Sequence, residues 1–247
     1  MKTILTIDWD FFFNADFDTR DEIFLQGEDF AQSEANHKYQ IQAWEKMYLN
    51  HSELIEVGVK EDDYNSFSLW LTNYMGKYSI SEGHEKVIAE ILKITSPDEE
   101  ILVYNIDFHH DLYAYGTGSL KYDCSNWVLA LKEMRPKLKY VWVYDETSQF
   151  SALYSENVIF DNKFTEAERV NIFYERFSRV SIPIDFVHLC KSELWSPPHL
   201  DLCFNDLARC LTKAPPATIN ERWHEVLDLM TTVPGVPGWR DKEMIQC

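Results

Sequence analysis

The chain's most informative run is Ile101-Leu102-Val103-Tyr104-Asn105-Ile106-Asp107-Phe108-His109-His110-Asp111. A short apolar segment followed by polar residues predicts a buried strand whose carboxyl end carries those polar groups. Asp107, His109 and Asp111 occupy alternate positions, so their side chains should leave the strand on one side. Open α/β sheets bind their ligands at the carboxyl ends of strands. These three residues are therefore candidate metal ligands.

The start of the chain repeats the pattern. Ile4-Leu5-Thr6-Ile7 leads directly into Asp8-Trp9-Asp10, in which Asp8 and Asp10 share one parity. Either group alone is explained equally well by polar residues that end a strand. Together, the two strand ends favour opposite walls of one metal site.

Size and composition indicate a globular protein. The chain has 247 residues, of which 45% are apolar and 15% aromatic, enough to build one α/β domain. No segment reaches the length of a membrane span, and the N-terminus lacks the pattern of a signal peptide, so we expect a cytoplasmic protein without membrane contact. The cysteines show no CxxC spacing, so nothing indicates a thiolate zinc site.

The charge balance bears on partners. The formal net charge is −18, from 41 acidic and 23 basic residues. Such a field repels phosphate backbones, so we expect no nucleic-acid partner, whereas a cationic partner would be attracted. Excess acidity is more often a solubility feature, so it supports this interpretation only weakly.

Strand-like and helical runs alternate along the chain. The predicted strands are residues 3–8, 101–107, 140–144, 157–160 and 186–190, and the predicted helices are 39–50, 85–94, 126–133, 200–211 and 219–229. This alternation predicts an α/β fold with a mainly parallel sheet flanked by helices. We expect a single domain over residues 1–247, with a helical insertion at 14–80.

A two-ion site needs a further histidine, and His84 is the best candidate. It lies in the turn-like run Ser81-Glu82-Gly83-His84-Glu85, just before the helix that leads to the 101–107 strand. The competing interpretation is a solvated histidine that caps this helix. Carboxylates and imidazoles without thiolates favour a hard divalent ion such as Mn²⁺, with Asp8 and Asp107 as bridging ligands.

These motifs resemble those of the arginase/agmatinase (ureohydrolase) superfamily. Residues 107–111 are similar to its DxHxD motif, and residues 8–10 to the DxD core of its second motif. Gly83-His84 resembles the end of its GGDH motif, at a similar separation from DxHxD (107 − 84 = 23 residues). The motif order is permuted, because in ordinary arginases the DxD strand follows the DxHxD strand. This order, the three phenylalanines after Asp10 and the Asn126-Trp127 pair resemble the peptide-arginase branch, which converts arginine residues in ribosomal precursor peptides to ornithine.

The resemblance implies a three-layer arginase-like fold and two Mn²⁺ ions. One ion would be held by His84, Asp107, Asp111 and Asp8, and the other by Asp107, His109, Asp8 and Asp10. Two cations that share a water lower its pKa, which favours attack on a guanidinium carbon. Asp111 would accept a proton and return it to the departing amine, giving urea and ornithine.

Four other residues have alternative or non-metal roles. Glu193, beyond the 186–190 strand, resembles the glutamate that ureohydrolases place beside the guanidinium group, although an ordinary surface glutamate explains it equally well. Asn126 either holds the substrate backbone or caps the helix it begins, which we favour slightly. His110 should point away from the metals, and His188 should be a satisfied core histidine. The downstream proton-shuttling histidine of free arginases has no counterpart between Asp111 and His188.

Three functions fit these observations. We favour manganese-dependent hydrolysis of arginine residues in a cationic precursor peptide. A second possibility keeps the fold and the metals but takes a small free guanidino compound, or an acylated amine as in the related deacetylases. A third is a non-catalytic acidic protein that binds a cationic peptide. Assays of urea, acetate and metal content would distinguish these functions.

Overall fold

The computed structural model describes residues 1–16, 19–20, 37–113, 122–148, 164–165, 167–178, 181–215 and 220–230. The predicted strand 157–160 lies outside these residues. Contacts divide the chain into two compact units, Met1–Phe11 with Met75–Ser192, and Phe12–Tyr74 with Glu193–Cys247. The expectation of a single domain with an insertion at 14–80 stays a prediction.

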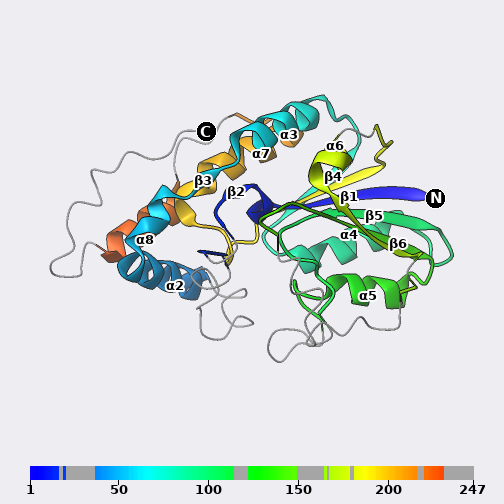
Figure 1. Ribbon diagram of the computed structural model, residues 1–247, viewed down its shortest axis with the longest axis horizontal. Coiled ribbons are helices and arrows are strands. Elements are labelled where there is room, and N and C mark those ends of the chain that lie inside the picture. Colours follow the sequence, from blue (N-terminus) through cyan, green and yellow to red (C-terminus); the bar gives the residue numbers. More distant parts are fainter. Residues whose placement is uncertain are drawn as a thin grey trace. The chain divides into compact units, whose positions relative to one another are not determined.

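The first unit contains a six-stranded sheet in the order β4-β8-β1-β5-β6-β7 (Figure 1). The strands are β1 (Lys2–Asp8), β4 (Lys77–Ser81), β5 (Ile101–Ile106), β6 (Leu138–Tyr144), β7 (Arg169–Phe173) and β8 (Phe186–Cys190). All five described pairings are parallel. The prediction of an α/β fold with a mainly parallel sheet is therefore confirmed.

Helices cover both faces of this sheet. On one face, α4 (Val87–Ile94) and α5 (Trp127–Met134) join a buried apolar cluster with strand residues such as Ile4 and Val103. On the other face lies α6 (Tyr174–Ser178), whose Phe177 ring centroid is 5.2 Å from that of Tyr104. Tyr104 and Val103 are neighbours on β5 and so point to opposite faces. The central strands are therefore buried on both sides, which explains their continuous apolar runs.

The second unit is mainly helical. It contains α2 (His37–Asn50), α3 (Glu61–Asn73), α7 (Asp201–Thr212) and α8 (Glu221–Met230), with short strands β2 (Phe13–Asn14) and β3 (Gly58–Val59). Helix α2 packs against α8, and α3 packs against α7. A buried ion pair joins Arg222 to Asp201 at 2.8 Å. Among the described helices of both units, none is long and apolar enough to cross a membrane.

Candidate metal centre

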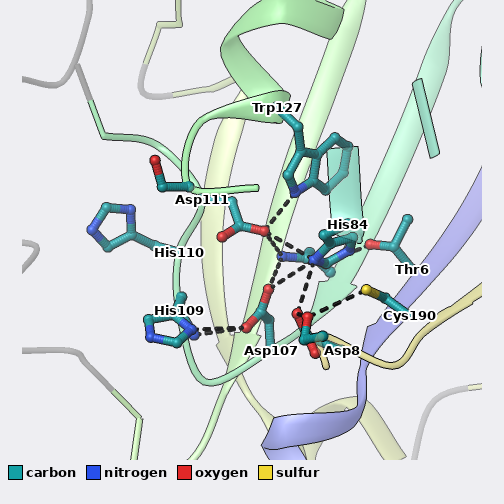
Figure 2. Close-up of polar contacts among 12 residues, drawn as sticks. Thr6, Asp8, His84, Asp107, His109, His110, Asp111, Trp127 and Cys190 are labelled. Carbon is teal, nitrogen blue, oxygen red and sulfur yellow. Dashed lines mark hydrogen bonds and ion pairs between the residues drawn. The ribbon is translucent and has the colours of Figure 1, made fainter. Parts of the chain in front are cut away.

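Two adjacent strands of the first unit end in the predicted acidic residues. Strand β1 pairs with β5 in a register that places Ile7 beside Ile106, so Asp8 and Asp107 follow neighbouring strand ends. On the other side of β1, β8 places Cys190 beside Asp8. Figure 2 shows these side chains gathered around one point with His84. The carboxyl edge of the parallel sheet is thus where the candidate ligands meet.

His84 lies at the centre of the first group of ligands. It begins a 3-10 turn (η4, His84–Lys86) between β4 and α4, and only 1% of its surface is exposed. Its Nδ1 is 3.1 Å from Oδ2 of Asp111 and 3.3 Å from an Oδ2 of both Asp8 and Asp107. Despite these distances, neither ring nitrogen has a hydrogen bond of acceptable geometry. Three carboxylate oxygens converge on one nitrogen, as ligands do around a cation, and the solvated interpretation of His84 is wrong.

A second group forms around His109. Its Nδ1 is 3.2 Å from Oδ2 of Asp10 and 3.8 Å from Oδ1 of Asp107. Asp107 therefore presents Oδ2 to His84 and Oδ1 to His109. The donor atoms of Asp10, Asp107 and His109 lie within 4.8 Å of one another, as do those of His84, Asp107 and Asp111. The two groups share Asp107, which is the arrangement that a bridging carboxylate requires.

Two left-handed backbone positions help to aim the carboxylates. Asp111 has a φ of 52° and Ser192 a φ of 47°, a region that costs a residue with a side chain roughly 1–2 kcal/mol. Asp111 accepts a hydrogen bond from the indole N–H of Trp127 through its Oδ2. Ser192 donates its hydroxyl to Oδ2 of Asp8 at 2.6 Å. Both unusual conformations thus occur at residues that contact the cluster.

Asn105 lies on β5 two residues before Asp107, and its side chain contacts two of the carboxylates. Its Nδ2 donates to Oδ2 of Asp107 and to the hydroxyl of Tyr140, each at 3.0 Å, and lies 3.4 Å from Oδ2 of Asp111. Its Oδ1 accepts the hydroxyl of Thr6, which determines which way the amide faces. Such outer contacts orient metal ligands and are a usual part of metal sites.

His188, on β8, contacts the serines that lead into the His84 turn (residues 81–86). Its Nδ1 is 2.7 Å from Oγ of Ser79 and its Nε2 is 3.1 Å from Oγ of Ser81. Because Ser81 donates its own proton to the carbonyl of Gly83, its oxygen must accept the Nε2–H of His188. Both ring nitrogens thus have hydrogen-bond partners, and His188 is the satisfied core histidine that the sequence indicated. Burial, reinforced by the charge of His84, lowers its pKa well below the ordinary value.

The electrostatics of the cluster favour a cation. Burial, then Asp10 and Asp107, raise the pKa of Asp8 from 3.8 to about 7. Burial and then Asp111 raise the pKa of Asp107 well above its ordinary value. Burial lowers the pKa of His109, but Asp10 outweighs it and the pKa rises to about 9. Carboxylates this close together in a dry site must hold protons or a metal ion, so the residues fit divalent cations.

His110 points away from the cluster, as its parity predicted (Figure 2). Its Nδ1 accepts the backbone N–H of Leu112 at 3.0 Å, and its ring packs against those of Tyr113 and Trp142. Burial, with the nearby charges of His109 and Arg169, lowers its pKa to about 3. His110 is thus a neutral packing residue.

Two other predicted site residues have different described contacts. Asn126 occupies the N-cap position of α5, but its side chain makes no capping bond and instead accepts the backbone N–H of Asp123 at 3.0 Å. The expected capping bond is therefore wrong. Glu193 belongs to the second unit, where its carbonyl accepts bonds from Trp44 and Arg222. Its role beside a guanidinium group stays a prediction.

Sequence reasoning missed several residues that contact the cluster. Cys190 was interpreted as an inert buried thiol, yet its Sγ, an oxygen of Asp8 and a nitrogen of His84 lie within 4.8 Å of one another. Its place at the end of a strand was visible in the sequence, but the order of the strands was not. Asn105 and Ser192 carried no recognisable pattern.

No family model, curated protein or solved structure matches this chain. The chemistry of the site therefore follows from the positions of its own side chains.

Proposed function

We propose that this chain is a binuclear metal-dependent hydrolase that converts arginine residues of a cationic precursor peptide to ornithine and urea. In this proposal the parallel sheet belongs to a three-layer arginase-like fold with permuted motifs. The observation that carries the proposal is the pair of ligand groups that share Asp107, one around His84 and one around His109. The order of motifs along the chain supports the peptide-specific branch.

The donor set supports two neighbouring ion positions. His84, Asp8, Asp107 and Asp111 would hold one ion, and His109, Asp10 and Asp107 the other, with Mn²⁺ as the expected metal. Oδ2 of Asp8 is 3.3 Å from Nδ1 of His84, and its Oδ1 accepts the backbone N–H of Asp10 at 3.4 Å. Asp8 therefore contacts one ligand of each position, His84 of the first and Asp10 of the second. When bound, the two ions supply Lewis-acid activation of water and substrate.

The protein's part in the reaction is proton transfer and substrate orientation. All contacts of Asp111 are made by its Oδ2, so among the described residues its Oδ1 remains available (Figure 2). We assign this oxygen to take the proton of the attacking water and deliver it to the substrate Nε. The bond between Cζ and Nε of the substrate breaks, urea leaves with Cζ, and Nε becomes the amine of ornithine.

The acidic character of the chain supports a cationic substrate. A net charge of −18 attracts a basic peptide and steers it electrostatically at low ionic strength. We assign Glu193 as the anionic partner of the substrate guanidinium. The same field would favour free arginine or agmatine far less, because each carries fewer positive charges than a basic peptide.

The test is direct. Protein loaded with Mn²⁺ is incubated with an arginine-containing precursor peptide, free arginine, agmatine and an acetylated amine. We expect urea and a peptide that has lost the mass of cyanamide, and the loss should disappear with chelator. Urea from free arginine alone would indicate a small-molecule ureohydrolase, and acetate a deacetylase.

Two variants sharpen this test. Glu193→Gln should lose most activity while its metal content is unchanged, and Glu82→Gln, an exposed acidic residue, is the matched control. Stoichiometric metal without any product from these substrates would refute the hydrolase. No metal at all would leave the acidic binder of a cationic peptide.

A further inference from the structure

We propose that Cys190 is a metal ligand, so that the ion at His84 is bound by a thiolate as well as by nitrogen and oxygen. This inference rests on the proposed metal centre and changes its chemistry. It makes the two positions unequal, because the donors around His109 are nitrogen and oxygen only.

The position of Cys190 carries the first argument. It is the last residue of β8, it pairs directly with Asp8, and none of its surface is exposed. Its Sγ lies within 4.8 Å of donor atoms of both Asp8 and His84, a spacing that one ion can bridge. Figure 2 shows the sulfur directed toward these two residues.

The second argument is independent of the cysteine. His84 is buried, and neither of its ring nitrogens has a hydrogen-bond partner among the described residues. Three carboxylate oxygens lie 3.1–3.3 Å from its Nδ1, an arrangement that is favourable when a proton or a metal ion is bound among these donors. His84 therefore marks an ion position, and Cys190 is one of the groups that surround it.

Ser192 ties the thiol to the carboxylate side of this position. Its Oγ is 3.3 Å from Sγ of Cys190 and donates to Oδ2 of Asp8 at 2.6 Å. The left-handed backbone of Ser192 places its hydroxyl between the two groups. On metal binding the thiol would lose its proton to solvent and ligate as the thiolate.

A sulfur ligand changes which metal is preferred. Thiolates favour Zn²⁺, Fe²⁺ and Co²⁺ over Mn²⁺, whereas carboxylate and imidazole sites accept Mn²⁺ readily. We infer that the His84 position takes a softer ion and the His109 position takes Mn²⁺. The centre would then hold two different metals.

Cobalt absorption tests this inference without any need for activity. Wild-type protein titrated with Co²⁺ should show visible d–d bands and a near-ultraviolet sulfur-to-cobalt charge-transfer band. Cys190→Ser should lose the charge-transfer band and keep d–d bands. Cys124→Ser, which changes a partly exposed free cysteine, is the matched control and should keep both.

X-ray absorption of the zinc-loaded wild-type protein gives a second test that needs no core variant to fold. It should show one sulfur neighbour at about 2.3 Å. Cobalt d–d bands without charge transfer, or a band that Cys124→Ser abolishes, would overturn the assignment. Failure to bind Co²⁺ at all would refute the metal centre as well. A thiolate band with no urea release would refute only the hydrolase.

Discussion

Single residues determine how many ions the site can hold, and Asp107 matters most among them. Its two oxygens face different imidazoles, with Oδ2 near His84 and Oδ1 near His109. Removing its charge therefore acts on both positions at once. A change at His109 acts on one position only.

We predict that Asp107→Asn abolishes binding of both ions, whereas His109→Ala retains the ion at His84. The measurement is the metal content of dialysed protein by plasma mass spectrometry, with Glu82→Gln as the exposed control. Equal metal content in the Asp107 and His109 variants would show that Asp107 is not a bridge.

Asn105 is a positioning residue whose importance is visible only in the structure. Asn105→Leu keeps the branched shape of the side chain but removes the amide that contacts Asp107 and Asp111. We expect metal affinity to fall by about 10–100-fold, as for other residues that orient ligands. Thr6→Val, which loses the bond that orients the amide and a longer contact with the carbonyl of Tyr104, should have a smaller effect. Unchanged affinity of the Asn105 variant in a metal titration would contradict this role.

Sequence reasoning brought Asp8, Asp10, Asp107, His109 and Asp111 together by strand parity, but only Asp8 lies in a strand. Asp10 is in the 3-10 turn Trp9–Phe12, and residues 107–111 follow the end of β5. The sequence could not predict that Cys190 lies beside Asp8. That contact depends on β8 being the other neighbour of β1, and a single sequence does not contain the order of parallel strands. Asn105 was hidden for another reason, because it lies inside an otherwise apolar strand.

Among the strands of the six-stranded sheet, those that sequence reasoning missed are the two edge strands. The central strands β1, β5, β6 and β8 have the apolar runs that predict burial on both faces. The edge strands β4 and β7 contain fewer apolar residues and are partly exposed. Edge strands commonly carry polar residues, which makes them difficult to distinguish from loops.

Strand β4 matters because it supports the His84 turn. Ser81 accepts the Nε2–H of His188 and donates to the carbonyl of Gly83, so one hydroxyl links the sheet to the turn that carries His84. The chain of contacts from His188 through Ser81 to Gly83 is buried or partly buried. Its loss would leave a buried donor without an acceptor.

We predict that Ser81→Ala destabilises the fold by about 1–3 kcal/mol, because the Nε2–H of His188 loses its acceptor. Urea unfolding measures this change. Ser66→Ala, an exposed serine of α3, should shift the free energy of unfolding by less than about 0.5 kcal/mol. Equal stability of the two variants would show that the Ser81 contact contributes nothing.

At the scale of the whole molecule, a net charge of −18 destabilises the folded metal-free protein, because its negative charges repel one another. Within the part of the chain that the structure describes, the cluster brings seven titratable side chains together. These groups come from the ends of β1, β5 and β8 and from the His84 turn: Asp8, Asp10, His84, Asp107, His109, Asp111 and Cys190. Metal binding and proton binding therefore compete at one place.

The sign of the resulting pH dependence follows from the pKa shifts. The pKa of Asp8 is raised from 3.8 to about 7, and that of His109 from 6.5 to about 9. Between about pH 4 and pH 9 these two groups therefore hold more protons in the native metal-free protein than in the unfolded chain. The buried histidines His110, His188 and His199 hold fewer protons than in the unfolded chain, but only below their unfolded pKa of about 6.5. Stability that rests on these protons is present below the unfolded pKa values and is lost as pH rises through the folded ones.

We therefore predict that, in chelator, the melting temperature falls as pH rises from about 7 to about 9, and that the increase caused by Mn²⁺ grows over the same range. Thermal unfolding at several pH values, with and without Mn²⁺, measures both slopes. Asp8→Asn should flatten the slope in chelator, because it removes one of the protons that the native state binds. Glu82→Gln should leave that slope unchanged, since its carboxylate is exposed. A metal-free protein that becomes more stable toward pH 9 would show that these groups do not share one dry cluster.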